Sequence, residues 1–291
     1  MAYEQVGEST LRAQFFDKAV KQVTSERYVM KQAVAVVSSN AWTNYFWREQ
    51  QAHLAPQTGN AIKGIPRLAE FPQASASWER ISTLMNKYGL EESIAWEDIQ
   101  TDEISVQTRT SIKIAEAVAH AVDTEIYNGL TENGTVVDIQ SFTIAATKHW
   151  NGASAAIIDD LLQAAEKIKD YNYPTDGLIC FVNSRDKRSI LTYLVGKGAQ
   201  FPQIATDATL NGEIGQLAGI KLIESKTIAS SGALVVVPKR CATWKEVQAL
   251  TTITKEDPYK SVTIRAVEMG TLQLTDPKAV VWIRNTYIAT G

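Results

Sequence analysis

The sequence predicts an α+β protein organised around one long helix, with a compact α/β module beside it. Three observations support this fold class. Apolar residues recur every three or four positions through 104–126, the period of an amphipathic helix. The apolar run 178–182 ends in a polar turn and is followed by a second helical pattern. With 291 residues, of which 45% are hydrophobic, the chain can bury a sizeable core.

The first half of the chain predicts extended segments before the long helix. Residues 1–40 are polar with scattered apolar positions and are expected to form an arm. Residues 41–83 open with the aromatic-rich "NAWTNYFWRE" and continue with many prolines and glycines, which predicts a long, projecting, two-stranded loop. The long helix is expected at 103–129, ending at an Asn-Gly pair that favours a left-handed C-cap.

The second half predicts alternating helices and strands. A helix is expected from Ile157 to Ile168, with acidic residues in its first turn and lysines in its last, where the helix dipole favours them. The strand "LICFV" and another helix follow, and "GQLAGIKLIESKTI" and "GALVVVPK" predict two more strands. Two further strands are expected in "SVTIRAVEMGTLQL" and "AVVWIRNTYI".

Charge and composition exclude several classes of protein. The formal net charge of −3 gives no bulk attraction to nucleic acid. No apolar run approaches the roughly 18 residues that a membrane helix needs, so we expect no contact with a membrane. The only cysteines, Cys180 and Cys241, are expected to be unpaired thiols in a cytoplasmic setting.

No motif predicts a catalytic, metal or cofactor site. The three histidines, His53, His120 and His149, do not pair at metal-ligand spacing. His120 has Glu116 and Asp123 one turn away on the long helix, which is either a proton-transfer cluster or, more simply, a polar helix face. Nucleophile elbows and phosphate-binding glycine loops are absent from the sequence. We therefore predict that the protein is not an enzyme and binds no cofactor.

The basic turn after "LICFV" has two interpretations. Arg185, Lys187 and Arg188 open a helix, whose free N–H groups favour an anion. The alternative is an ordinary turn in which Ser184 caps the helix, Asp186 complements its dipole, and the cations are solvated or paired. We favour the second interpretation because no glycine-rich cradle precedes the cations.

Segments of the chain, taken in order, resemble one known family. "IIDDLLQAAEKIKDYNYPTDGLICFVNSRDKRSIL" is similar to the family's helix, proline-containing turn, buried strand and next helix. "GEIGQLAGIKLIESKTI", "GALVVVPKR" and "SVTIRAVEMGTLQLTDPKAVVWI" resemble its later strands, and "AHAVDTEIYNGL" resembles the end of its spine helix. The family is that of the major capsid proteins of tailed bacteriophages and their archaeal relatives, with the Hong Kong 97-type shell fold. The resemblance covers most of residues 80–291.

The resemblance implies a division of the chain into an N-terminal arm at 1–40, an extended loop at 41–83, a peripheral domain at 84–150 and 251–291 with a spine helix at 103–129, and an axial domain at 151–250. It implies a major capsid protein that self-assembles, as pentamers and hexamers, into an icosahedral viral shell enclosing double-stranded DNA. The protein is then expected in the virion, after assembly in the host cytoplasm. An encapsulin-type cellular nanocompartment shell, or an enzyme with an unrecognised site, are the alternatives.

The resemblance also implies partners and contact residues. DNA is expected to be contacted without sequence preference, and a scaffolding protein, if one is used, to be a separate chain. A portal and decoration proteins are further candidate partners. The candidate intersubunit contacts are Trp42, Phe46, Trp47, Gln57, Ile65 and Phe71 in the extended loop, and Phe201 and Ile204 in the polar stretch 196–213.

Overall fold

The computed structural model describes residues 28–49, 64–73, 78–101, 106–132, 138–196, 215–229 and 231–288. The helices are the single turns η1 (Met30–Gln32) and η3 (Pro277–Ala279), together with α2 (Trp96–Gln100), α3 (Val106–Leu130), α4 (Ile157–Asp170) and α5 (Ser184–Gly196). The strands are β1 (Ala35–Ser38), β2 (Thr43–Glu49), β3 (Trp78–Leu84), β4 (Asn86–Ala95), β5 (Gln140–Thr143), β6 (Ile179–Val182), β7 (Gln216–Leu217), β8 (Ile220–Glu224), β9 (Gly232–Val236), β10 (Ala242–Asp257), β11 (Ser261–Leu274) and β12 (Val280–Arg284). The mixture of helices and sheets confirms the predicted α+β class.

The chain forms two compact units. Unit 1 contains the described residues of 1–44, 83–129 and 243–273, and unit 2 contains those of 45–82, 130–242 and 274–291. Each unit has a sheet of its own, so each is described separately.

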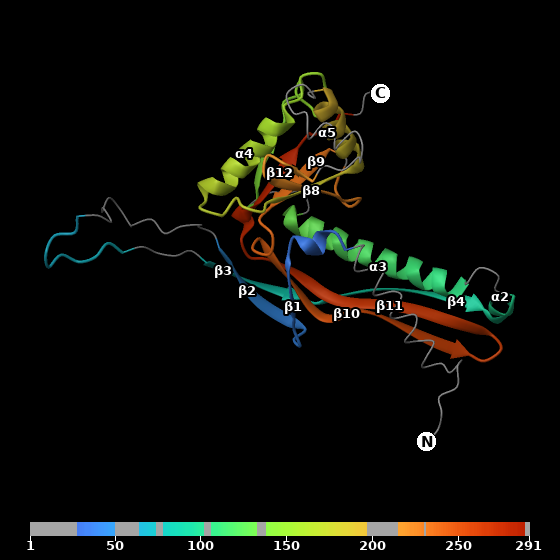
Figure 1. Ribbon diagram of the computed structural model, residues 1–291. Coiled ribbons are helices and arrows are strands. Elements are labelled where there is room, and N and C mark those ends of the chain that lie inside the picture. Colours follow the sequence, from blue (N-terminus) through green and yellow to red (C-terminus); the bar gives the residue numbers. More distant parts are fainter. Residues whose placement is uncertain are drawn as a thin grey trace. The chain divides into compact units, whose positions relative to one another are not determined.

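Unit 1 consists of a four-stranded sheet with α3 along one face (Figure 1). The strand order is β1-β10-β11-β4, with β1 parallel to β10 and β4 antiparallel to β11. Ile264 lies opposite Glu92 and Ala266 opposite Leu90 in the β11–β4 register. Because side chains alternate along a strand, the even-numbered positions of β11 face the helix.

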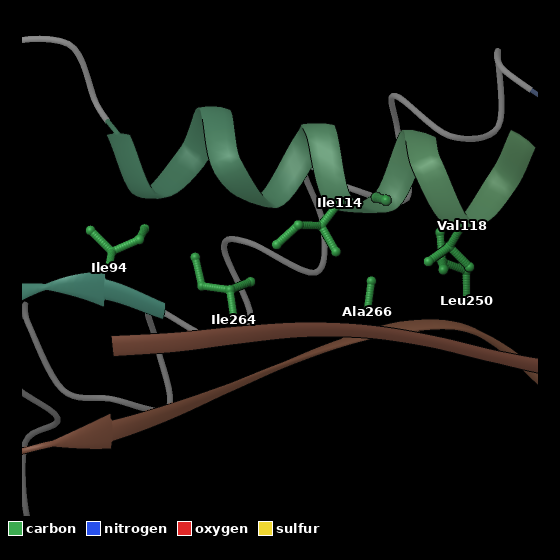
Figure 2. Close-up of a cluster of buried hydrophobic side chains, with 7 residues drawn as sticks. Ile94, Ile114, Val118, Leu250, Ile264 and Ala266 are labelled. Carbon is green, nitrogen blue, oxygen red and sulfur yellow. The ribbon is translucent and has the colours of Figure 1, made fainter. Parts of the chain in front are cut away.

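The core of unit 1 lies between α3 and the sheet. Figure 2 shows Ile114 and Val118 of α3 above side chains that rise from three strands. The buried cluster comprises Ile94, Ile114, Ala115, Val118, Leu250, Ile264 and Ala266. Burial of each large aliphatic side chain contributes about 1.5–3 kcal/mol. The predicted helical stripe is therefore the surface that holds the sheet.

The end of α3 differs from the prediction. The Asn-Gly pair was expected to stop the helix, but α3 continues through both residues to Leu130. Gly129 instead lies against Leu272 of β11, where an added Cβ would collide with the leucine side chain. The glycine is explained by this close approach of helix and strand, and not by a left-handed cap.

Unit 2 contains a six-stranded sheet of order β5-β12-β9-β6-β8-β7. Every residue of β6 and β9 is buried, as the apolar runs predicted. The predicted peripheral domain included 130–150 and 274–291. The structure places both ranges in unit 2, because β5 pairs in parallel with β12 and β12 pairs with β9.

Helix α4 packs on unit 2 through the predicted stripe. Ile157, Leu161, Ala164 and Ile168 are buried, and α4 lies beside β12. Asp160 in the first turn accepts a hydrogen bond of 2.9 Å from the indole nitrogen of Trp150. This first-turn carboxylate therefore fixes the loop before the helix as well as complementing its dipole.

We predict that Gly270→Ala destabilises the unassembled subunit. A Cβ at Gly270 would lie 2.6 Å from the buried Trp244 ring and 2.9 Å from the Lys245 carbonyl oxygen, and neither atom can move easily. The expected loss in free energy of unfolding is about 1–3 kcal/mol, measured by chemical denaturation. Gly196→Ala is the matched control, because nothing lies within 4 Å of its added Cβ. Equal stability of the two variants would show that the β11–Trp244 packing is wrong.

Candidate subunit-contact surfaces

The paired strands β2 and β3 form a separate two-stranded sheet with two unlike faces. On β2, Tyr45 and Trp47 point to one side and Phe46 and Arg48 to the other, because side chains alternate along a strand. Phe46 is only 7% exposed, whereas Tyr45 and Trp47 are 60% and 57% exposed. The face with Phe46 is therefore the inner one, and the face with Tyr45 is the outer one.

The outer face gathers three large aromatic side chains and an arginine. Trp78 of β3 is 53% exposed, and the guanidinium of Arg80 lies 4.1 Å from the centroid of the Tyr45 ring. Because positions two apart share a face, Trp78 lies on the same side as Arg80. We call Tyr45, Trp47, Trp78 and Arg80 the aromatic face. Tryptophan, tyrosine and arginine are the residues most enriched at the energetic centres of protein interfaces.

Arg48 anchors the inner side of this sheet. Its guanidinium lies 3.3 Å from a carboxylate oxygen of Glu132 and 3.0 Å from one of Asp138. Its Nε also donates a hydrogen bond of 3.4 Å to the carbonyl oxygen of Leu274. The three partners come from the loop after α3 and the end of β11, so one side chain ties the base of the two-stranded sheet to the rest of unit 2.

The structure separates the predicted contact residues into three groups. Trp42, Trp47 and Phe71 are exposed, and Ile65 is half-buried. Phe46 is buried inside the subunit, so it supports the sheet and does not belong to the exposed surface. The remaining predicted contacts, Gln57, Phe201 and Ile204, lie outside the described residues.

Sequence reasoning missed Trp78 and Arg80. Both lie in a stretch that was expected to be a strand, and the alternation of Trp78, Arg80, Ser82 and Leu84 was the available signal. Tyr45 and Arg48 stood out in the sequence only because they lie in the aromatic-rich stretch "NAWTNYFWRE". The stacking of Arg80 on Tyr45 joins residues from two strands, and no local pattern reports such a pairing.

The basic turn at the start of α5 is occupied by contacts within unit 2. The Lys187 ammonium lies 2.9 Å from a carboxylate oxygen of Glu224 on β8, and the Ser184 hydroxyl donates to the other oxygen. Both hydrogen bonds lower the pKa of Glu224. The guanidinium of Arg185 lies 5.7 Å from the Tyr287 ring centroid. The predicted Ser184 cap is wrong, because α5 begins at Ser184 and the Asn183 side chain accepts the backbone N–H of Arg185 at 3.2 Å. The contacts of Ser184, Lys187 and Arg185 within unit 2 otherwise support the ordinary-turn interpretation.

Asp186 in the same turn is buried, which the sequence did not predict. One of its carboxylate oxygens accepts a hydrogen bond of 2.9 Å from the Thr286 hydroxyl. Burial raises the pKa of Asp186 to about 7, and the threonine hydrogen bond opposes that rise. Asp186 therefore joins α5 to the segment after β12, in addition to any effect on the helix dipole.

The cluster of Glu116, His120 and Asp123 on α3 is divided by burial. His120 is exposed and contacts the Thr124 hydroxyl at 3.1 Å, whereas Asp123 is buried. Both oxygens of Asp123 accept backbone N–H groups of the segment before β1. Across the described ranges, no group of three or more His, Cys, Asp or Glu side chains is placed to hold a metal ion. None of the described helices is long and apolar enough to cross a membrane.

Solved shell proteins share this fold. The chain is similar to the virus-like particle from Pyrococcus furiosus, with a TM-score of 0.63, 9% identity, and coverage of 94% of this chain and 99% of that one. The capsid of the cyanophage P-SCSP1u gives a TM-score of 0.65, 13% identity and 88% coverage of each chain. A chain of Mycobacterium phage Che8 gives a TM-score of 0.62, 18% identity, and coverage of 85% of this chain and 86% of that one. No curated protein sequence matches the chain significantly.

These similarities show the fold, which is the Hong Kong 97-type fold. The sequence model of the family described as phage capsid protein matches residues 80–283, which is well over half of the chain. The protein belongs to this phage capsid family. Family and fold together point to a structural shell protein and a component of the virion.

We predict that Arg48→Met loosens the two-stranded sheet. The substitution removes the cation that Glu132 and Asp138 share, and a hydrogen bond to a charged group contributes about 1.5–3 kcal/mol. Backbone amides of β2 and β3 should therefore exchange with deuterium about tenfold faster in the unassembled subunit.

The matched control is Arg265→Met. Arg265 pairs with Glu91 on the surface of unit 1, where both side chains are more than half exposed. Such exposed pairs contribute about 0–1 kcal/mol, so exchange in β4 and β11 should change little. Unchanged exchange of β2 and β3 in the Arg48 variant would refute the anchoring role.

Proposed function

We propose that the protein is a major capsid subunit that self-assembles into an icosahedral shell around double-stranded DNA. The observation that carries the proposal is the aromatic face on the anchored β2–β3 sheet, in a chain of the phage capsid family. A neighbouring copy of the chain is the partner of this face. Pentamers and hexamers of the subunit form the closed shell.

The physical case for a protein partner starts from the exposed rings. Leaving Tyr45, Trp47 and Trp78 more than half exposed gives up the stabilisation that their burial provides. Each large aromatic side chain buries about 150–250 Å² in a core or an interface. Arg48 and Phe46 fix the opposite side of the sheet, so the strands that carry the rings are already ordered before binding. Binding a partner therefore costs little conformational entropy.

The rest of the extended loop supports the same role. Phe71 is 79% exposed in the described segment 64–73, and Leu68 is fully exposed. Neither residue belongs to a sheet. The predicted contacts at Gln57, Phe201 and Ile204 remain part of the proposal on sequence grounds, with the last two expected at the capsomer axes.

The proposal extends to other partners. Packaged DNA is contacted weakly and without sequence preference, since the net charge of −3 provides no general attraction. Scaffolding, portal and decoration proteins are separate chains. Assembly takes place in the host cytoplasm.

A second candidate is an encapsulin-type shell that holds no genome. The observation behind it is the similarity to the Pyrococcus furiosus shell, which is described as a virus-like particle. Particles isolated from the source organism distinguish the two. Nuclease-protected double-stranded DNA inside the particles supports the viral shell, and a protein cargo without DNA supports the second candidate.

The direct test of assembly is electron microscopy of the purified chain together with sedimentation velocity. Closed shells of uniform diameter are expected. A population of monomers and small oligomers under all conditions of concentration and salt would contradict self-assembly by this chain alone.

We predict that the double variant Trp47→Ser, Trp78→Ser stays folded but fails to form shells. Both rings are more than half exposed in the subunit, so their removal costs little stability, whereas rings at the centre of an interface contribute about 2 kcal/mol or more each. Leu162→Ser on α4 is the control, because Leu162 is also half exposed. Normal shells from the double variant would exclude the aromatic face as a contact.

A further inference from the structure

The segment before β1 is short and is held inside unit 1. Met30, Ala33 and Val34 are buried at 0%, 0% and 2% exposure. The segment has one turn of 3-10 helix, η1, which is too short to be stable alone. Side chains of α3, β10 and β11 must therefore hold it in place.

Asp123 of α3 holds the start of this turn. One carboxylate oxygen accepts the backbone N–H of Val29 at 2.9 Å, and the other accepts that of Met30 at 3.3 Å. The Asp123 side chain is almost fully buried. It supplies the cap that no residue of the segment itself provides.

Two glutamates hold the other side of the segment. Glu268 of β11 is fully buried and accepts hydrogen bonds from the Tyr28 hydroxyl and, at 2.6 Å, from the Lys31 ammonium. The same ammonium lies 3.3 Å from Glu246 of β10 and 3.9 Å from the centroid of the Tyr28 ring. Lys31 is thus the centre of the contact.

The charges of this cluster do not balance. Three carboxylates, on Asp123, Glu246 and Glu268, surround one ammonium. Among the described residues, His120 on α3 also acts on Asp123, and Tyr88 on β4 interacts with Glu268. Protonation of Asp123 in mild acid reduces the excess negative charge, and higher pH retains it.

We propose that Tyr28, Lys31, Asp123, Glu246 and Glu268 form an arm latch, which binds residues 28–34 to unit 1 more tightly in mild acid than above neutral pH. The device belongs to the single subunit and does not depend on the shell function. It gives this part of the predicted N-terminal arm a pH-dependent attachment.

The titration of Asp123 supports the same direction. Burial raises the pKa of Asp123 from 3.8 to about 6, against the opposing effects of the Val29 and Met30 N–H groups, Lys31 and His120. In the released state the carboxyl returns to its ordinary value. The latched state then binds more protons between these two values, so its extra stability is full below pH 3.8 and is lost as the pH rises through about 6.

The test is hydrogen exchange of the full-length, unassembled chain, followed by mass spectrometry of peptides that contain Val29 and Met30. After correction for intrinsic rates, protection should be about tenfold greater near pH 5 than near pH 8, as a carboxyl pKa of about 6 in the latched state requires. Protection that is constant or smaller in acid would overturn the proposal.

Three variants separate titration from packing. Asp123→Asn should remove the pH dependence, while Asp159→Asn, on the exposed face of α4, should keep it. Lys31→Met should move the midpoint to higher pH, because Lys31 lowers the Asp123 pKa. If Asp123→Asn does not fold, the pH midpoint of protection in Lys31→Met provides the test. The arm latch is contradicted if that midpoint does not shift, or if a folded Asp123→Asn shows the same pH dependence of protection as the unsubstituted chain.

Discussion

The apolar contact between α3 and the sheet of β4, β10 and β11 is the constraint on which unit 1 depends. β10 and β11 are 16 and 14 residues long, and strands of that length need a covered face to remain in one register. Ile114 and Val118 supply the cover for Ile264, Ala266 and Leu250. A leucine side chain at Gly129, and a tryptophan ring and a backbone carbonyl at Gly270, lie too close for an added Cβ.

The same contact explains where the polar groups of unit 1 lie. Asp123 is on the buried side of α3, and Glu268 shares the helix-facing side of β11 with Ile264 and Ala266. Charged residues in such positions are costly unless they are paired. The segment 28–34 provides the pairs, through two backbone N–H groups, a phenol and an ammonium, so the fold of unit 1 is complete only when this segment is bound.

Unit 2 shows the opposite arrangement at its two-stranded sheet. The inner side is fixed by Arg48 and Phe46, and the outer side presents three aromatic rings. A subunit that folded only for its own stability would place these rings inward. Their exposure on an anchored sheet is consistent with a surface that is buried by another copy, as the capsid family implies.

Periodicity predicted the elements that have one clear pattern. The stripe of α3, the stripe of α4 and the apolar run of β6 were all found, since burial of one face dictates the residue spacing. The strand β10 was missed because "ATWKEVQALTTITKED" mixes charged residues into a strand that is solvent-exposed near its end. Glu246 is tolerated in β10 because it pairs with Lys31, more than 200 positions away in the sequence, and no local pattern records that partner.

The candidate site was predicted only in part for the same reason. Trp42 and Trp47 stood out by composition. Arg48, in contrast, pairs with Glu132 and Asp138, which lie just beyond the end of α3 and far from Arg48 in the sequence.

The most direct measurement is a cryo-electron microscopy map of assembled particles at side-chain resolution. The account predicts density from a neighbouring copy packed over Tyr45, Trp47 and Trp78, with Arg48 still bound to Glu132 and Asp138 within the same subunit. A map in which these three rings face solvent in every symmetry-independent subunit would contradict the central claim that the aromatic face is the contact through which this protein builds its shell.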